Sequence, residues 1–177
     1  NMILYKKVSI VVPAYNEKNT LAGVVGRIKK ADVLGLEREI ILVDNFSTDG
    51  TREIMKELAK DPAIKVILHA FNEGVGKSWR DGMSASKGEI IIRQDADTEY
   101  QPEDFPLLLK PILDGEARIV YGSRILGIAK SKYRYKTYLW GGLLINKLIN
   151  LILGTRLTDV LTASKVFDKS ILEHFTL

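Results

Sequence analysis

Apolar positions in the first half of the chain form short continuous runs that alternate with segments of helical spacing. The runs are rich in Val and Ile and predict four buried strands, at residues 7–12, 39–44, 64–69 and 89–94. The intervening segments place apolar residues on one helix face and predict helices at residues 17–30, 51–60 and 74–87. Strands that alternate with helices need crossover connections, so we expect an α/β fold with a largely parallel sheet covered on both faces. Pro13 is expected to end the first strand.

The pattern changes after Pro102. The sequence there predicts a helix at residues 103–114, a strand at 117–121 and a loop at 122–136, and the sheet is expected to gain a mixed edge. Residues 138–153 then form a helix that is apolar over most of its circumference, with Asn146, Lys147 and Asn150 on one side. The helix is shorter than the ~20 apolar residues of a membrane span, which favours a position on a membrane surface. Burial in the core or in a dimer interface is the alternative.

Composition and charge narrow the class of protein. The length of 177 residues, with 46% apolar and 27% charged residues, indicates one globular domain over residues 1–177. The absence of cysteine excludes disulfides, thiolate metal sites and a catalytic Cys. No secretory signal is recognisable at the N-terminus, so export by that route is not expected. Four cations precede the apolar helix, so residues 130–153 are expected to contact a membrane surface or an acceptor: Lys130, Lys132, Arg134 and Lys136.

The strongest chemical signal is an acidic pair directly after the fourth predicted strand. Asp95 and Asp97 are two residues apart, so in extended chain their side chains point the same way. Two carboxylates held that close repel each other unless a cation lies between them, and hard oxygen ligands suit Mg²⁺ or Mn²⁺. Glu99 could complete the ligand set. A solvated acidic turn is the alternative, and the position at a strand end favours the metal.

Ligands of parallel α/β sheets bind beyond the carboxyl ends of the strands. Asp44 ends the second predicted strand and could accept hydrogen bonds from a ribose or a base, whereas Ser47 and Asp49 are better explained as helix caps. Residues 71–77 are glycine-rich and open a helix, so they either approach a ligand closely or form a tight turn; they match neither the GxGxxG nor the P-loop spacing. Arg124 follows the predicted strand at 117–121 and is suited to bidentate phosphate contact, with a surface ion pair as the alternative.

Five motifs in this order resemble family 2 glycosyltransferases of the GT-A fold. They are residues 11–17 (VVPAYNE), 43–51 (VDNFSTDGT), 72–77 (NEGVGK), 95–97 (DAD) and 122–124 (GSR). The chain is most similar to the polyprenol-phosphate hexose synthases, the dolichol-phosphate mannose or glucose synthase type. The resemblance implies a Rossmann-like three-layer sandwich with a mostly parallel central sheet.

The resemblance also implies site residues. The nucleotide-sugar pocket would be formed by Pro13, Tyr15, Glu17, Asp44, Asn72, Gly76, Lys77, Asp95 and Ala96. The metal, Mg²⁺ or Mn²⁺, would be held by Asp95, Asp97 and Glu99, and the catalytic residues would be Asp97, Arg124 and Asp159. Arg124 and Arg134 would meet the acceptor phosphate. Asp159 becomes a candidate base only for a hydroxyl acceptor, because a phosphate acceptor is already an anion.

The expected function is therefore inverting transfer of glucose or mannose from a UDP- or GDP-sugar to a polyprenol or dolichol phosphate, at the cytoplasmic face of a membrane. A family 2 enzyme acting on a polysaccharide or protein hydroxyl, and a non-catalytic nucleotide-sugar binding module, are the alternatives. Nucleic acid is not an expected partner, because the basic residues form one short loop without a stacking platform. Two departures from the resemblance concern the base pocket and the acceptor: Asn45 and Phe46 replace an acid and a small residue, and residues 161–165 replace a Gly-aromatic-basic element.

Overall fold

The structure, a computed structural model, describes residues 5–126 and 136–174. Within them, six strands form one sheet in the order β3-β2-β1-β4-β6-β5. The strands are β1 (Lys7–Ala14), β2 (Glu37–Asp44), β3 (Ile64–Leu68), β4 (Ile90–Arg93), β5 (Ile119–Tyr121) and β6 (Lys165–Asp168). The helices are α1 (Leu21–Lys30), α2 (Thr51–Leu58), α3 (Gly74–Ala85), α4 (Phe105–Leu113) and α5 (Lys136–Leu153), with short 3-10 turns η1 (Pro102–Asp104) and η2 (Lys169–His174).

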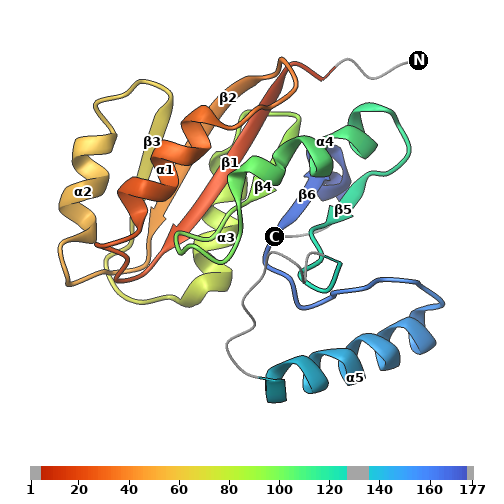
Figure 1. The fold of residues 1–177 in the computed structure, drawn as a ribbon. Coiled ribbons are helices and arrows are strands. Elements are labelled where there is room, and N and C mark those ends of the chain that lie inside the picture. Colours follow the sequence, from red (N-terminus) through yellow and green to blue (C-terminus); the bar gives the residue numbers. More distant parts are fainter. Residues whose placement is uncertain (1–4, 127–135, 175–177) are drawn as a thin grey trace.

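The predicted three layers are present. Helices α1, α2 and α4 cover one face of the sheet, and α3 covers the other (Figure 1). Alternate residues of each strand supply the two cores: Ile10 and Leu42 pack on the side of α1, whereas Val11 and Val43 pack on the side of α3. Because β1, β2, β3 and β4 are parallel, their carboxyl ends meet at one edge of the sheet. This edge is where a ligand is expected.

Pro13 does not end the first strand, contrary to the prediction. It lies within β1 and is in register with Val43 of β2. The backbone of Val11 faces β4, since its carbonyl accepts from the Gln94 N–H, and the backbone of Ala14 faces β2. By alternation Pro13 faces β4, beyond the point where the pairing of β4 ends. The missing N–H of proline therefore costs no ladder hydrogen bond.

The expected mixed edge is made by a strand that the sequence pattern did not reveal. β6 lies antiparallel to both β4 and β5 and separates them. It has only four residues, Lys165–Asp168, with polar side chains at both ends, so it carries no distinct apolar run. Because β6 starts at the carboxyl edge, the chain leaves the sheet after β5 and returns to it at the same edge. The Gly122 N–H donates to the Ser164 carbonyl at 2.9 Å and joins the two ends of this excursion.

Helix α5 lies apart from the layered core, beyond the carboxyl edge of the sheet (Figure 1). Its two asparagines turn toward the following segment. Asn146 is 6% exposed and accepts from the Val160 N–H at 2.7 Å, and Asn150 donates to the Leu157 carbonyl at 2.7 Å. Leucines and isoleucines point away from these contacts, with exposures of 61% at Leu144, 49% at Leu148, 80% at Leu151, 76% at Ile152 and 65% at Leu153. The polar side of α5 is thus inward and the apolar side outward. No helix among the described residues is long and apolar enough to cross a bilayer.

Candidate functional site

The loops after β1 and β2 are tied together at the carboxyl edge. The Asn16 N–H donates to Ser47 Oγ at 2.9 Å, and the Asn16 side chain accepts in turn from the Thr48 N–H at 2.9 Å. The Glu17 N–H donates to Thr51 Oγ1 at 2.8 Å. Asn16 adopts a left-handed φ of 58°, which asparagine tolerates better than most residues. Tyr15 comes directly before these anchors and keeps half of its surface exposed, so its backbone is held in place and its ring stays accessible to a ligand.

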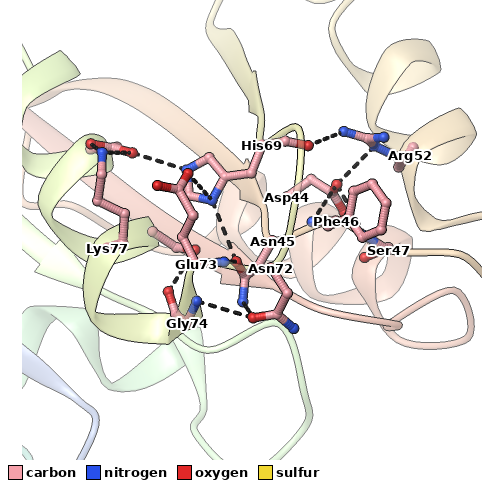
Figure 2. Close-up of polar contacts among 12 residues, drawn as sticks. Asp44, Asn45, Phe46, Ser47, Arg52, His69, Asn72, Glu73, Gly74 and Lys77 are labelled. Carbon is pink, nitrogen blue, oxygen red and sulfur yellow. Dashed lines mark hydrogen bonds and ion pairs between the residues drawn. The ribbon is translucent and has the colours of Figure 1, made fainter.

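Asp44 organises the loop after β2. Its carboxylate is fully buried and accepts from the Phe46 and Ser47 N–H groups at 3.0 and 3.2 Å, and Arg52 Nε lies 2.8 Å from it (Figure 2). Phe46 has a left-handed φ of 68°, and the Arg52 guanidinium lies 5.7 Å from the centre of its ring. A phenylalanine in this conformation is strained, and the Asp44 hydrogen bonds hold it there. In this structure Asp44 thus shapes the loop, and its contact with a nucleoside stays a prediction.

A second network connects the ends of β2 and β3 with the start of α3. Asn45 Oδ1 accepts from the Glu73 N–H at 2.9 Å, and Asn45 Nδ2 donates to Asn72 Oδ1 at 2.9 Å (Figure 2). Asn72 Oδ1 also accepts from the Gly74 N–H at 3.0 Å. Gly74 has a φ of 82°, a conformation that favours glycine. Side chains therefore occupy two N–H groups at the beginning of α3, and the glycine-rich segment forms a tight turn.

Lys77 and His69 meet at Asp81. Lys77 Nζ lies 2.6 Å from Asp81 Oδ2, and His69 Nε2 lies 2.9 Å from the same oxygen. The hydrogen bond from Lys77 lowers the pKa of Asp81, with a smaller contribution from His69 in the same direction. His69 is 5% exposed, with its other ring nitrogen 3.4 Å from Asn45 Oδ1, so it is buried between the two networks. Lys77 is held by Asp81, and a Cβ at Gly76 would lie 3.8 Å from Arg80 Nη1, an ordinary contact distance.

The acidic motif follows β4, as predicted. Burial raises the pKa of Asp95; Arg93 opposes this, and the charges of Asp97 and Glu99 add to it. Asp97 Oδ1 accepts from the Glu99 N–H at 2.9 Å, and the Glu99 carboxylate lies 3.1 Å from Arg124. Among the described residues, no three acidic or histidine side chains are arranged to hold a metal. Asp95 and Asp97 still fit Mg²⁺ or Mn²⁺, since these ions take one or two carboxylates and fill their other positions with phosphate oxygens and water.

Arg124 lies at the same edge, where two acids hold it. Its Nε and Nη2 donate to the two oxygens of Asp159 at 2.8 and 3.0 Å, and its backbone N–H donates to Asp159 at 3.1 Å. These bonds, together with the one to Glu99, raise the pKa of the guanidinium and keep it charged. Asp159 is 4% exposed and both of its oxygens are engaged by Arg124. The arrangement makes Asp159 a residue that positions Arg124, whereas its role as a base stays a prediction.

The remaining predicted residues are placed as follows. Pro13 and Ala96 are buried at the carboxyl edge, and the Glu17 carboxylate accepts from the Thr20 hydroxyl. Arg134 lies outside the described residues. Two cations that the sequence analysis did not single out, Arg93 and Lys165, occupy paired positions on β4 and β6 at this same edge. Only the register of the missed strand β6 could have indicated their proximity.

A scan against protein families decides the assignment. Residues 9–176 match the family model described as glycosyl transferase family 2. The chain belongs to this family. The resemblance inferred from the five motifs is thereby confirmed, and the carboxyl edge of the sheet, with the loops after β1, β2 and β4, lies inside the matched range.

Curated relatives of this family 2 glycosyl transferase act on polyprenol phosphates, according to their names. A dolichol-phosphate mannosyltransferase of Pyrococcus furiosus is 36% identical over 67% of this chain and 33% of its own length. An undecaprenyl-phosphate 4-deoxy-4-formamido-L-arabinose transferase of Aeromonas hydrophila is 29% identical over 95% of this chain and 51% of its own length. A UDP-N-acetylglucosamine–dolichyl-phosphate N-acetylglucosaminyltransferase of Methanococcus voltae is 28% identical over 95% and 72%. The first two alignments span only a third and about half of those relatives.

Solved structures confirm the GT-A fold. A glucosyl-3-phosphoglycerate synthase from Mycobacterium tuberculosis, solved with Mn²⁺, UDP and phosphoglyceric acid, superposes with a TM-score of 0.70 at 24% identity, covering 94% of this chain and 57% of that chain. TarS from S. aureus superposes with a TM-score of 0.65 at 18% identity, covering 95% and 48%. At these identities the likeness establishes the architecture of the family 2 glycosyl transferase domain.

Proposed function

We propose that this family 2 domain transfers a hexose from a nucleotide-diphosphate sugar, UDP- or GDP-linked, to a polyprenol phosphate with inversion at the anomeric carbon. The observation that carries the proposal is the position of Asp95 and Asp97 directly after β4, at the same edge of the sheet as Arg124, which is 3.1 Å from Glu99 of the same acidic motif. Tyr15, after β1, is exposed at this edge. Carboxylates for a divalent cation and a guanidinium for phosphate are the groups that departure of a diphosphate requires. The names of the curated relatives support the lipid-phosphate acceptor.

The donor would lie across the loops after β1 and β2. Tyr15 presents an exposed ring against which a base can stack, and the next two residues are fixed by hydrogen bonds from their N–H groups to Ser47 and Thr51. Asp95 and Asp97 would hold Mg²⁺ or Mn²⁺, which supplies positive charge against the negative charge of the leaving diphosphate. Burial and the charges of Asp97 and Glu99 raise the pKa of Asp95 although Arg93 opposes them, so a cation between the two aspartates would stabilise their charged forms.

In the proposed step, an oxygen of the acceptor phosphate forms a bond to the anomeric carbon while the bond from that carbon to the diphosphate breaks. The acceptor is already an anion, so the step transfers no proton and needs no strong base. This agrees with the engagement of both Asp159 oxygens by Arg124. Arg124 would stabilise charge on the phosphate groups, held in orientation by Asp159.

The test uses the protein with Mn²⁺, a radiolabelled sugar nucleotide and a polyprenol phosphate. We expect a glycolipid product, and we expect Asp97→Asn to lower its rate at least about a hundredfold, the scale of losing one essential electrostatic group. Glu53→Gln, at an exposed acid on α2, is the control and should leave the rate unchanged. Transfer to a polysaccharide or protein hydroxyl without any glycolipid would refute the acceptor assignment, and nucleotide-sugar binding without transfer would refute the enzymatic role.

We also propose that the outward apolar side of α5 rests on the lipid surface that carries the acceptor. The helix exposes leucines and isoleucines while its asparagines bond inward, which is the orientation that a membrane-surface helix requires. The basic residues at 130–136 precede it in the sequence and would be attracted to anionic headgroups.

Flotation with anionic lipid vesicles tests this position of α5. Leu151→Glu should reduce the bound fraction severalfold, because the side chain is 80% exposed and a charge there cannot enter the acyl region. Leu107→Glu is the matched control, at a leucine that is 73% exposed on α4. Equal loss of binding in both variants, or no loss in either, would contradict the proposed contact.

A further inference from the structure

A row of side chains crosses the sheet at its carboxyl edge and changes character along its length. Val11 of β1 is in register with Arg93 of β4, which pairs with Lys165 of β6, which pairs with Tyr121 of β5. On the same face, two residues away from the pair, Ile91 and Phe167 belong to the apolar core beneath α3. This face of the sheet is thus apolar at Ile91 and Phe167, beneath α3, and cationic at the carboxyl edge, where Arg93 and Lys165 lie.

Among the described residues the two cations have one ion-pair partner between them, the Asp95 carboxylate, which pairs with Arg93. Arg93 lies 3.3 Å from Asp95 and 5.9 Å from the ring centre of Trp79, with 19% of its side chain exposed. Lys165 Nζ lies 5.1 Å from the ring centre of Tyr121. Among the described residues, the Lys165 ammonium has neither an ion pair nor a hydrogen bond. Burial lowers the pKa of Lys165, the charge of Arg93 lowers it further, and Asp159 acts in the opposite direction.

Neighbouring carboxylates do not neutralise the pair. Asp159 gives both oxygens to Arg124, and Asp95 is shared between Arg93 and the proposed metal position. Like charges directly opposite each other on paired strands destabilise a sheet. Such an arrangement at a ligand-binding edge is explained when an anion completes it, because a phosphate oxygen can accept from both a guanidinium and an ammonium.

We propose that Arg93 and Lys165 form a phosphate-binding pair, beside Asp95 and separate from the Arg124–Asp159 pair. The ligand chemistry is a phosphate group, which could belong to the acceptor monophosphate or to the donor diphosphate. This assignment of the phosphate to one of the two substrates rests on the proposed function, but binding of phosphate itself does not. Lys165 is then a specificity-determining residue for the phosphate-bearing substrate.

The first experiment measures thermal unfolding of the wild type and of Lys165→Met with increasing inorganic phosphate. Removing one of two repelling cations should leave the melting temperature of the phosphate-free protein unchanged or raise it. Phosphate affinity should fall about tenfold, the factor for losing one charge-assisted hydrogen bond. Lys165→Arg should retain the affinity. Lys65→Met, at an exposed lysine on β3, is the matched control and should behave as the wild type.

Two further titrations identify the source of the phosphate. A nucleoside diphosphate and a short polyprenyl monophosphate are titrated separately against the wild type and Lys165→Met, and the ligand whose affinity falls is the one bound by the pair. Unchanged affinity for inorganic phosphate and for both substrates would overturn the proposal, as would a lower melting temperature with an unchanged phosphate response. Phosphate binding through Lys165 in a protein without transferase activity would instead refute the proposed function alone.

Discussion

Replacing Asp159 by asparagine separates two roles for this residue, a base that accepts a proton and a group that orients Arg124. The substitution keeps the size of the side chain and removes its charge. If the asparagine oxygen takes the place of the oxygen that accepts from Arg124 Nε at 2.8 Å, the new NH₂ group faces Arg124 Nη2, a donor 3.0 Å away. One charge-assisted hydrogen bond is lost and a donor then faces a donor.

The expected loss of stability follows from these contacts. A hydrogen bond to a charged group contributes about 1.5–3 kcal/mol. Asp159 is buried and the Arg124 side chain is 22% exposed, so we take about 2 kcal/mol. For a chain of this size that corresponds to a fall in the melting temperature of about 4–8 °C. Asp114→Asn, at the exposed Lys110–Asp114 pair, should leave the melting temperature nearly unchanged, because solvent screens the pair.

The assay combines calorimetry with the pH dependence of transfer to polyprenol phosphate. If Asp159 orients Arg124, Asp159→Asn lowers kcat about tenfold or more, and the shape of the pH–rate profile is unchanged. A base would give a different result, because its removal eliminates the acidic limb of the profile. Loss of that limb together with an unchanged melting temperature would refute the positioning role.

Two further substitutions test the packing and the polar network. In Gly82→Ala the new methyl would overlap Val11 Cγ1, so we expect the free energy of unfolding to fall by about 1–3 kcal/mol. In Gly23→Ala the methyl would enter open space on α1, so the free energy of unfolding should rise by up to about 1 kcal/mol. Chemical denaturation measures both changes, and equal effects would contradict this packing. Lys77→Met should cost about 0.5–1 kcal/mol at pH 7. The pKa of Asp81 is lowered in the folded protein, so this contribution is present above the ordinary value of 3.8 and is lost as the pH falls through the folded-state pKa. Denaturation from pH 7 to pH 3 measures it, and a penalty independent of pH would show that the ion pair is not its cause.

The sequence predicted the parts of the fold in which local pattern and tertiary burial agree. Strands β1 to β4 are aliphatic because helices cover both faces, and their carboxyl ends carry Asp44 and Asp95 where the topology places a ligand. Strand β6 was not predicted because four residues are too few to show a periodic pattern of apolar positions. The prediction that Pro13 ends the first strand was wrong because a strand tolerates proline where the proline nitrogen faces no pairing partner. Which strand that nitrogen faces is a property of the assembled sheet.

The candidate site was predictable as a set of residues but not as a set of pairs. The bond between Arg124 and Asp159 joins positions 35 residues apart, and Asn45 joins Asn72 from 27 residues away. No local spacing indicates such partners. The same limit applied to Arg93 and Lys165, which are neighbours only through the register of β6.

The backbone hydrogen bond between Gly122 and Ser164 closes the base of an insert in the sheet. The described residues of this insert, α5 included, leave the sheet after β5 and return to it at β6. Substituting or lengthening that insert costs little loop-closure entropy and leaves the register of the six strands untouched. A chimaera that takes this insert from one of the curated polyprenol-phosphate relatives, with Arg124 and Asp159 retained, would test whether the proposed membrane and acceptor preferences move together as one module.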